Sequence, residues 1–541
     1  MAALVGFVAK GIQSWITSGG KLRDIAGGSD LVEEIPGRVR DDMMKACRAT
    51  SAGSGEGVTI LSTGAGAFRL LVADDGAAAR MVRLLPLMIA EWAPGLRYGL
   101  AWHELAGDRP TAREFDAFEN ELRTDGGLAG PVLPPATPFT LRAQRTGEPA
   151  VDDKERDDDG VQGPEAVDCS MRRRRDAAGG GRASVFKTRL FPDMAGDFAK
   201  DVDVIVGDGR YMAVLHADGN GLGQLFMAIG KDESLGAEDR TRLLRDLSNA
   251  VKEATEEAFL AALHDIVRDV ATRKTIPVRP IVLGGDDVTA LLPARDAIRF
   301  TETFLTRFGI ETGERLKGLK NSPVYIPDRL TACAGIAFVK AHYPFDQAHT
   351  LAESLCRFAK AGSRRGEGRT LASLAFHRVT TTLARDFAGD IVAHDLSQRV
   401  DDELRLLTMA PYRVPEGDGE VPDGNNDEGH TPLARLRDLL RLADVVDRLP
   451  RGSWRELAGL VRENDVLAAA RYHRLVEVIP KEAAHDLRSA LSALGCAPPR
   501  LWTSKGTKER PARSPMLDVT ALLAATGRGK GAGEEAEEAV P

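Results

Sequence analysis

The sequence is poor in cysteine and in aromatic residues, and it has no long apolar segment. Its 541 residues include five cysteines, none in a C-x-x-C spacing, which argues against a zinc ribbon and against a disulfide framework. Aromatic residues make up only 5% of the chain. No apolar run approaches the roughly 18 residues of a membrane span, and the N-terminal residues lack the pattern of a secretory signal. We therefore expect a cytoplasmic protein with reduced thiols and no membrane contact.

An excess of positive charge is also missing. The chain has 72 Lys plus Arg against 80 Asp plus Glu, a formal net charge of −8, whereas domains that bind nucleic acid directly are usually basic. Part of the negative charge lies in an acidic run at 152–159 and in a glutamate-rich tail after Gly527. We therefore expect little RNA binding by the isolated chain, although partner subunits could bring RNA to it.

One architecture occurs twice in the chain. Within residues 1–105, strands are predicted at 4–12, 58–62, 69–73 and 96–102, and helices at 29–49, with Ser29 as N-cap, and 77–92. Within residues 208–385, strands are predicted at 211–217, 278–283, 288–292 and 330–339, and helices at 242–270, 296–308 and 345–360. Both sets follow the β-α-β-β-α-β order of the ferredoxin-like unit. The fold class predicted is α+β, with two ferredoxin-like domains.

The remaining segments have other patterns. Residues 106–207 have little apolar periodicity, so we expect an irregular insert, with an acidic run and an arginine run at 172–175. These arginines could contact RNA phosphates or belong to a solvated linker. Residues 386–520 are expected to form a helical C-terminal domain, with helices at 433–449, 454–463, 465–478 and 481–493. Residues 521–541 are expected to form a disordered acidic tail.

Three aspartates are expected to converge in the second unit. Asp218 ends its first strand, and Asp286 and Asp287 lie at the tip of its central hairpin. In a ferredoxin-like sheet this strand and this hairpin are neighbours. Two carboxylates about 4 Å apart repel by roughly 4 kcal/mol at an effective dielectric near 20, so the cluster needs protons or cations. Two Mg²⁺ or Mn²⁺ ions are the simplest solution, and such a pair activates a hydroxyl and stabilises the leaving group in phosphoryl transfer.

Glycines and one lysine fit the same site. Lys360 ends a predicted helix and is placed to meet a γ-phosphate, while small residues leave room for phosphates or a base: Gly219, Asn220, Gly221, Gly284 and Gly285. Each piece alone has a simpler interpretation, because GGDD and Asp218-Gly219 could be polar turns and Lys360 a solvated helix end. Their occurrence together, in order, favours a phosphoryl-transfer site.

On these residues the chain resembles the large, polymerase-like subunit of type III CRISPR effector complexes, whose two palm domains are related to GGDEF-type nucleotidyl cyclases. In the first unit the similar segments are GIQSWI at 11–16, KLRDI at 21–25 and Gly28-Ser29. In the second unit they are DGNGLG at 218–223, GGDD at 284–287, residues 332–337 and Ala359-Lys360. The resemblance covers both units and, more loosely, the helical C-terminal region.

The resemblance implies synthesis of cyclic oligoadenylate from ATP, with two Mg²⁺ or Mn²⁺ ions, when a complex of crRNA-guided subunits binds a target RNA. By position, Asp218, Asp286 and Asp287 would be catalytic and would bind the metals. The nucleotide would be bound by Gly219, Asn220, Gly221, Gly284, Gly285 and Lys360. The first palm has no acid at its hairpin tip, 63–66, and is therefore expected to be non-catalytic.

The chain departs from the family pattern at three places. The first palm begins at residue 4, so no His-Asp nuclease domain is expected. The segment between the palms holds only Cys169, where a zinc module often sits, and Asn220 stands where many members have a second aspartate, which would reshape one metal site. Two other functions stay open: a catalytically silent scaffold subunit of a ribonucleoprotein, and a stand-alone cyclic dinucleotide synthase acting as a dimer of second palms.

Overall fold

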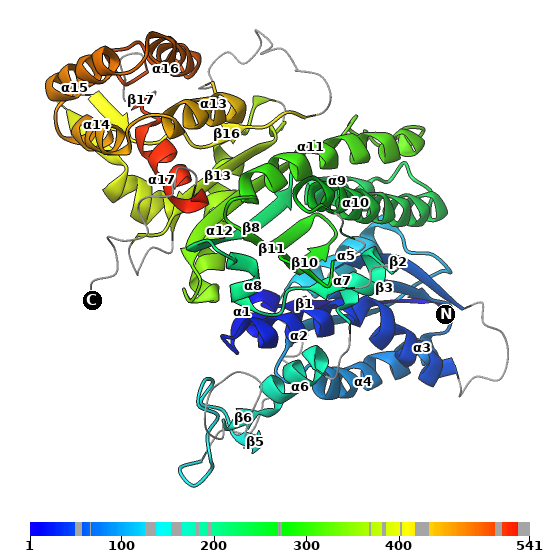
Figure 1. Cartoon of the computed structure of the whole chain (residues 1–541). Coiled ribbons are helices and arrows are strands. Elements are labelled where there is room, and N and C mark those ends of the chain that lie inside the picture. The colour runs from blue at the N-terminus through cyan, green and yellow to red at the C-terminus, as the bar shows by residue number, and fades with distance from the viewer. Residues whose placement is uncertain are drawn as a thin grey trace.

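The computed structural model describes residues 1–48, 57–64, 66–124, 137–152, 165–179, 183–192, 196–268, 270, 273–366, 369–380, 386–400, 403–416, 432–503 and 511–527. Helices and several sheets form it together, so the predicted α+β class is confirmed. Figure 1 shows the first α/β unit in blue below the second unit in green, with the C-terminal helices beyond the second unit. Within the described residues, no helix is both long and apolar enough to cross a membrane.

The first unit is built on a four-stranded antiparallel sheet in the order β2-β3-β1-β4. Its strands are β1 (Ala3–Lys10), β2 (Val58–Gly64), β3 (Ala67–Val72) and β4 (Arg97–Glu104). Its helices are α1 (Ile12–Thr17), α2 (Leu22–Glu33), the π-helical turn η1 (Ile35–Val39), α3 (Arg40–Arg48) and α4 (Asp75–Trp92). The hydrophobic faces of sheet and helices meet in a core that contains Phe7, Leu70 and Ile89.

The predicted segment 29–49 is largely helical up to Arg48, as the end of α2, η1 and α3, but its predicted start at an N-cap Ser29 is wrong. Helix α2 begins at Leu22, and Ser29 lies inside it. Gly27 and Gly28 lie within α2, at its contact with Arg174 of α6, and do not end a helix. A Cβ on Gly27 would lie 1.8 Å from the carbonyl oxygen of Arg174, so only glycine lets the two helices approach this closely. The predicted first strand was also too long, because α1 follows Lys10 almost at once.

The second unit repeats this sheet and extends it. The order is β10-β11-β8-β12-β13-β16, and the first four strands are antiparallel neighbours, as in the first unit. The strands are β8 (Tyr211–Gly219), β10 (Arg279–Gly284), β11 (Asp287–Pro293), β12 (Ala332–Lys340), β13 (Ser373–Arg378) and β16 (Tyr412–Arg413). The helices are α9 (Leu222–Lys231), α10 (Ala237–Ile266), α11 (Ala297–Leu316), the short 3₁₀ helix η2 (Lys317–Leu319) and α12 (Phe345–Gly362).

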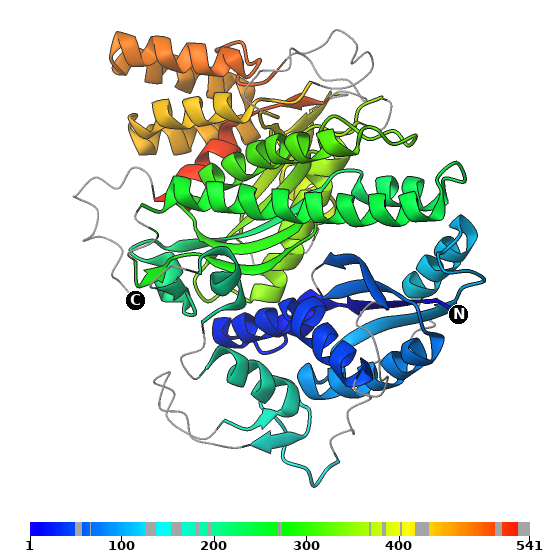
Figure 2. The same ribbon diagram turned by 90° about the vertical axis from the view of Figure 1, so that its right-hand side faces the viewer.

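The internal repeat extends to details of the hairpins. Strand β2 has a bulge between Ile60 and Ser62, and β10 has one between Pro280 and Val282, and in each hairpin three residue pairs separate the bulge from the turn. The two units also pack reciprocally, since α2 lies against β10 and α10 lies against β2. Figure 2 shows the units stacked, with the C-terminal helices on the side away from the first unit. Each hairpin is therefore supported by a helix of the other unit.

The described part of 106–207 is not irregular, contrary to the prediction. It contains α5 (Ala112–Arg123), β5 (Ala150–Asp152), β6 (Val167–Asp168), α6 (Cys169–Ala178), α7 (Val185–Leu190), β7 (Asp197–Phe198), which pairs with β9 (Thr275–Ile276), and α8 (Val202–Val206). A capping box formed by Thr111 and Glu114 fixes the start of α5. The acidic run beyond residue 152 lies outside the described residues.

Two arginines of the run at 172–175 are core residues. Arg174 and Arg175 are 0% and 4% exposed. Arg174 donates to the carbonyl oxygen of Trp15 over 2.8 Å, and Arg175 pairs with Asp24 and Glu165, each at 2.8 Å. A buried guanidinium needs such partners. The expectation of a solvated linker or an RNA contact is therefore wrong for these two residues, which dock α6 onto the first unit.

The C-terminal region is not purely helical. It contains the π-helix η4 (Phe387–Asp395), α13 (Leu436–Asp447), α14 (Arg451–Glu463), α15 (Asp465–Val478), α16 (Lys481–Ala493) and α17 (Met516–Thr526). It also contains a small sheet of β14 (Ser397–Val400), β15 (Glu403–Leu406) and β17 (Ala512–Arg513). The predicted tail at 521–541 is helical up to Thr526, and 528–541 lie outside the described residues.

Helix α17 is fixed to the second sheet by a buried carboxylate. Asp518 accepts hydrogen bonds from the backbone N–H of Met409 (2.7 Å), the Thr408 hydroxyl (3.1 Å) and the Tyr412 hydroxyl. We expect Asp518→Ala to lower the free energy of unfolding by about 3 kcal/mol, because it leaves buried donors without an acceptor. Urea unfolding measures this change. The exposed Glu482→Ala is the control, with an expected change below about 0.5 kcal/mol, and equal losses in the two variants would contradict the prediction.

Candidate metal and nucleotide site

Three carboxylates meet where β8 ends and the hairpin of β10 and β11 turns. Asp218 lies near the end of β8, Asp287 opens β11, and Asp286 lies in the turn between the strands. One carboxylate oxygen from each of the three lies within 4.8 Å of the other two. The pairing of β11 with β8 brings them together, as the strand order of the sequence predicts. An all-oxygen donor set of this kind suits a hard divalent cation.

The electrostatics of the cluster favour the same kind of ligand. Burial, followed by the charge of Asp218, raises the pKa of Asp286 to about 6. Burial, followed by the charges of Asp286 and Asp218, raises the pKa of Asp287 to about 8. Without a cation, the cluster therefore holds protons near neutral pH. A bound cation would displace these protons.

Lys360 already offsets part of this negative charge. Its ammonium group lies 2.6 Å from Asp218 Oδ2 and 2.8 Å from the carbonyl oxygen of Gly219. Burial acts to lower the pKa of Lys360, but the hydrogen bond and the charge of Asp218 outweigh it and raise the pKa. The last turn of α12 thus brings the Lys360 ammonium group to the carboxylates, and the sequence predicted this location at the end of a helix.

Glycines shape the backbone around the carboxylates. A Cβ on Gly219 would lie 2.6 Å from the Cβ of Asp286, so glycine there lets the hairpin tip close onto the end of β8. Gly285 in the turn has φ 64°, and Gly221 before α9 has φ 74°. These left-handed conformations favour glycine. Gly284 pairs with Asp287 and closes the hairpin.

Asn220 is tied to the start of β12. Its side-chain amide donates to the Thr331 hydroxyl (3.0 Å) and to Cys333 Sγ (3.4 Å), and its backbone N–H donates to the Thr331 carbonyl (2.8 Å). The side chain is almost fully buried. Asn220 therefore fixes the loop that follows Asp218 through these three contacts.

A cavity of 460 Å³ opens beside the turn, between the two units. Asp286 and Asp287 form part of its wall, and α9, α10 and α5 and the hairpin of β2 and β3 form the rest. The sequence analysis missed the following lining residues: Arg69, Phe115, Glu119, Phe226 and Ser248. Arg69 lies in β3, two residues after the pair Gly64–Ala67 that closes the hairpin, and it binds the Glu119 carboxylate through two nitrogens. The repeat itself was the available signal, because it places the two hairpins in equivalent positions.

The first unit has no carboxylates at the equivalent places. Its hairpin closes with the pair Gly64–Ala67, as the second closes with Gly284–Asp287. Ala67 pairs with Val8 of β1. Alanine and valine therefore stand where the second unit has Asp287 and Asp218, and neither can bind a metal ion.

Comparison with known proteins found one matching family and a set of similar solved structures. The family described as Cas10/Cmr2, second palm domain, matches residues 211–367. A search of curated proteins found no match. Among solved structures, the Csm1-Csm4 cassette in complex with cA4 is similar at 13% identity and a TM-score of 0.42, over 68% of this chain and 55% of that chain. The cassette in complex with pppApA is similar at 13% identity and a TM-score of 0.46, over 98% of this chain and 69% of that chain.

The match over residues 211–367 includes all three aspartates, the GGDD turn and Lys360. The chain spans a little over half the length of the first of these solved chains. Residues 211–367 therefore form a second palm domain of the Cas10/Cmr2 kind, and the resemblance of the chain to the large, polymerase-like subunit of type III CRISPR effector complexes is confirmed.

Proposed function

We propose that the second palm is an ATP-dependent nucleotidyltransferase that makes cyclic oligoadenylate. The observation that carries this proposal is the meeting of Asp218, Asp286 and Asp287, two of which, Asp286 and Asp287, line a cavity between the palms. Its volume of 460 Å³ lies within the range of small-molecule sites, about 300–1,000 Å³. The strand order shared by the two units supports the finer assignment of both as ferredoxin-like palms related to GGDEF cyclases.

The carboxylate cluster fits two Mg²⁺ or Mn²⁺ ions. It offers oxygen donors only, and the pKa values of Asp286 and Asp287 are raised by burial and then by the charges of the neighbouring aspartates. Asp218, Asp286 and Asp287 would hold the ions. When bound, divalent ions would lower the pKa of the attacking 3′-hydroxyl and compensate the negative charge of the leaving pyrophosphate.

The other residues bind and orient the nucleotide. The turn at Gly284 and Gly285 and the loop at 219–221 let phosphates approach the backbone N–H groups. Lys360 would exchange its contact with Asp218 for the triphosphate as Asp218 takes a metal ion. The first palm, with Arg69 and Phe115, would close the cavity from the opposite side without performing chemistry.

We further propose that the chain works with crRNA-guided subunits, which bind the target RNA and switch the palm on. The family match supports this assignment. The isolated chain would bind RNA weakly, because its net charge is −8 and two of its clustered arginines are buried.

The test is the conversion of ATP by the purified chain, alone and with its copurifying subunits and target RNA. We expect oligoadenylates, identified by mass spectrometry, only when Mg²⁺ or Mn²⁺ is present. A cyclic dinucleotide as the main product would favour the stand-alone synthase. Metal-dependent ATP binding without any product would favour the silent scaffold.

Lys360→Met is expected to raise the KM for ATP about tenfold, because a charge-assisted contact to phosphate is lost. Steady-state kinetics over a range of ATP concentrations measure this. Arg357→Met is the matched control, since Arg357 lies on the same helix but is exposed and pairs with Glu353. An unchanged KM in Lys360→Met would remove Lys360 from the nucleotide site.

A further inference from the structure

Strand β10 leads into the GGDD turn, and it lies at the edge of its sheet. Two of its carbonyl oxygens accept hydrogen bonds from side chains of distant elements. The Ser29 hydroxyl of α2 donates to Ile281, and Arg189 Nη2 of α7 donates to Leu283 over 2.9 Å. Leu283 immediately precedes Gly284. The edge of the catalytic hairpin is thus held by the first palm and by the insert.

Arg189 connects this strand to three helices. Its Nη1 pairs with Glu33 of α2, its Nε lies 3.1 Å from Glu256 of α10, and its Cζ lies 5.5 Å from the ring centre of Phe186 in α7. The side chain is 23% exposed, and those of Glu33 and Glu256 are 7% and 20% exposed. A guanidinium has a planar, rigid set of donors, so simultaneous contacts of this kind fix its orientation.

The neighbouring contacts hold the same hairpin. At the start of β10, the fully buried Arg279 donates to the carbonyl oxygen of Ala26 (3.1 Å) and to Asp30 (3.3 Å) of α2. At the turn, the Thr255 hydroxyl of α10 donates to the carbonyl oxygen of Gly285 (2.6 Å). Thr255 directly precedes Glu256 in α10. Arg189 therefore binds β10 at Leu283, just before the turn, and it also pairs with Glu256 of α10. Glu256 is adjacent to Thr255, which binds the turn itself.

We propose that Arg189 is a positioning residue, which sets the place of the GGDD turn and connects the insert and the first palm to the metal site. It touches neither a reacting atom nor a metal ligand. It acts through the Leu283 carbonyl and through Glu256. Its effect on catalysis rests on the proposed function, whereas its effect on the hairpin does not.

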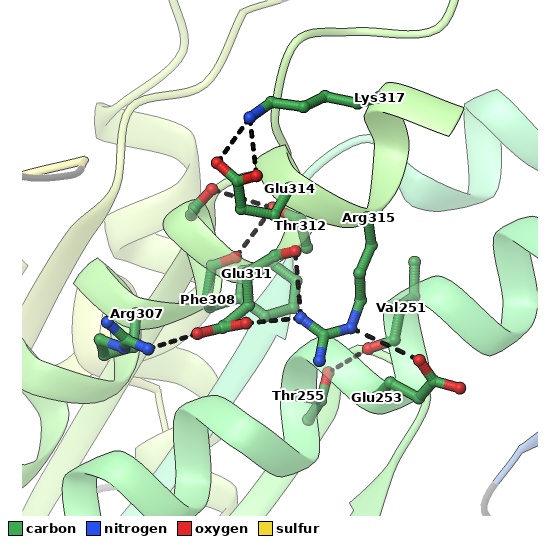
Figure 3. Close-up of polar contacts among 11 residues, drawn as sticks. Val251, Glu253, Thr255, Arg307, Phe308, Glu311, Thr312, Glu314, Arg315 and Lys317 are labelled. Carbon is green, nitrogen blue, oxygen red and sulfur yellow. Dashed lines mark hydrogen bonds and ion pairs between the residues drawn. The ribbon is translucent and has the colours of Figure 1, made fainter. Parts of the chain in front are cut away.

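Arg315 provides a matched control, as Figure 3 shows. It bridges α11 and α10 by contacts to Glu311 (2.5 Å) and Glu253 (3.5 Å), and it is 24% exposed. Arg189 and Arg315 thus have the same side chain, the same burial and a partner on the same helix. They differ in that Arg189 also binds the strand that carries the turn.

The experiment compares Arg189→Lys, Arg189→Met and Arg315→Met with the wild type. Lysine keeps the charge beside Glu33 and Glu256 but lacks the planar set of donors. Three properties are measured: amide hydrogen exchange of peptides covering 281–289 in metal-free buffer, Mn²⁺ affinity by electron paramagnetic resonance, and kcat and KM for ATP. Thermal unfolding reports whether each variant is folded.

We expect exchange of 281–289 to speed up about tenfold, with a similar loss of Mn²⁺ affinity and kcat, in Arg189→Met. Arg189→Lys should recover part of the loss with an unchanged unfolding temperature, and Arg315→Met should match the wild type. If Arg189→Met does not fold, Arg189→Lys decides: a folded Lys variant with wild-type exchange and Mn²⁺ affinity overturns the proposal. If the wild type does not convert ATP, the proposed function is contradicted. The role of Arg189 in positioning the hairpin is still tested, because hydrogen exchange does not depend on activity.

Discussion

Asp286→Asn together with Asp287→Asn is expected to lower the conversion of ATP to oligoadenylate by about a thousandfold or more. The two side chains supply most of the carboxylate oxygens of the cluster, and asparagine has nearly the same shape without the charge. The loss should therefore fall on metal binding and turnover, while the fold is kept. Product formation in saturating Mn²⁺, with unfolding temperature measured in parallel, checks both parts.

The matched control is a second Asp-Asp dipeptide, Asp41 and Asp42, which lies in the first turn of α3. Asp41→Asn with Asp42→Asn makes the same chemical change outside the cavity and should leave turnover unchanged. An Asp286→Asn, Asp287→Asn protein with wild-type turnover would remove these residues from catalysis. A variant that does not fold would make Asp218→Asn the deciding measurement, because Asp218 is the third member of the cluster and its side chain is 34% exposed.

The stability of the metal-free protein is expected to fall as the pH rises. The pKa values of Asp286 and Asp287 are about 6 and about 8 in the folded protein, against 3.8 for an ordinary aspartate. The folded state therefore binds these protons more tightly than the unfolded state does. The stability contributed by these two protons is fully present below about pH 4 and is lost as the pH rises to about 8, by an amount on the order of a few kcal/mol.

Divalent metal should reverse this loss, and most strongly at alkaline pH. At pH 8.5 the two carboxyl groups are largely ionised and free to bind Mg²⁺ or Mn²⁺, whereas at pH 5.5 protons compete for them. We expect the metal-induced rise in unfolding temperature to be larger at pH 8.5. Thermal unfolding in EDTA and in Mg²⁺ at both pH values measures it. Asp286→Asn with Asp287→Asn should lose less stability with rising pH and should show no metal shift, and a wild type that responds like this variant would contradict the prediction.

The sequence predicted those parts of the protein that depend on local pattern. Helices α15 and α16 have the predicted bounds, because Asn464 and Pro480 mark their starts and each has an apolar stripe. The meeting of Asp218 with the hairpin tip was predicted because the order of strands in the chain implies their order in the sheet. The functional roles of these residues stay predictions.

The features that the sequence did not reveal depend on contacts between distant segments. Glycine is needed at position 27, inside a helix, because α6 touches the backbone there. Arg174 can be buried because α1 supplies hydrogen-bond acceptors for it. In the sequence, Arg69 and Arg189 cannot be told from ordinary surface arginines, because their partners belong to distant segments. Propensity and periodicity report on neighbours along the chain, so they contain no signal for such contacts.

The contacts of α2 with β10 also bear on how the chain folds during synthesis. Ser29 and Ile281 are 252 positions apart, and Ala26 and Arg279 are 253 apart. Contacts of such separation form late, because the loop between them must first be closed. Helix α2 leaves the ribosome long before its partner strand, so the face of the first unit that contacts β10 stays exposed until the second unit has been made. The hairpin of β10 and β11 is therefore expected to reach its final position among the last steps of folding, and a shortened chain that ends before residue 279 should expose a surface prone to aggregation.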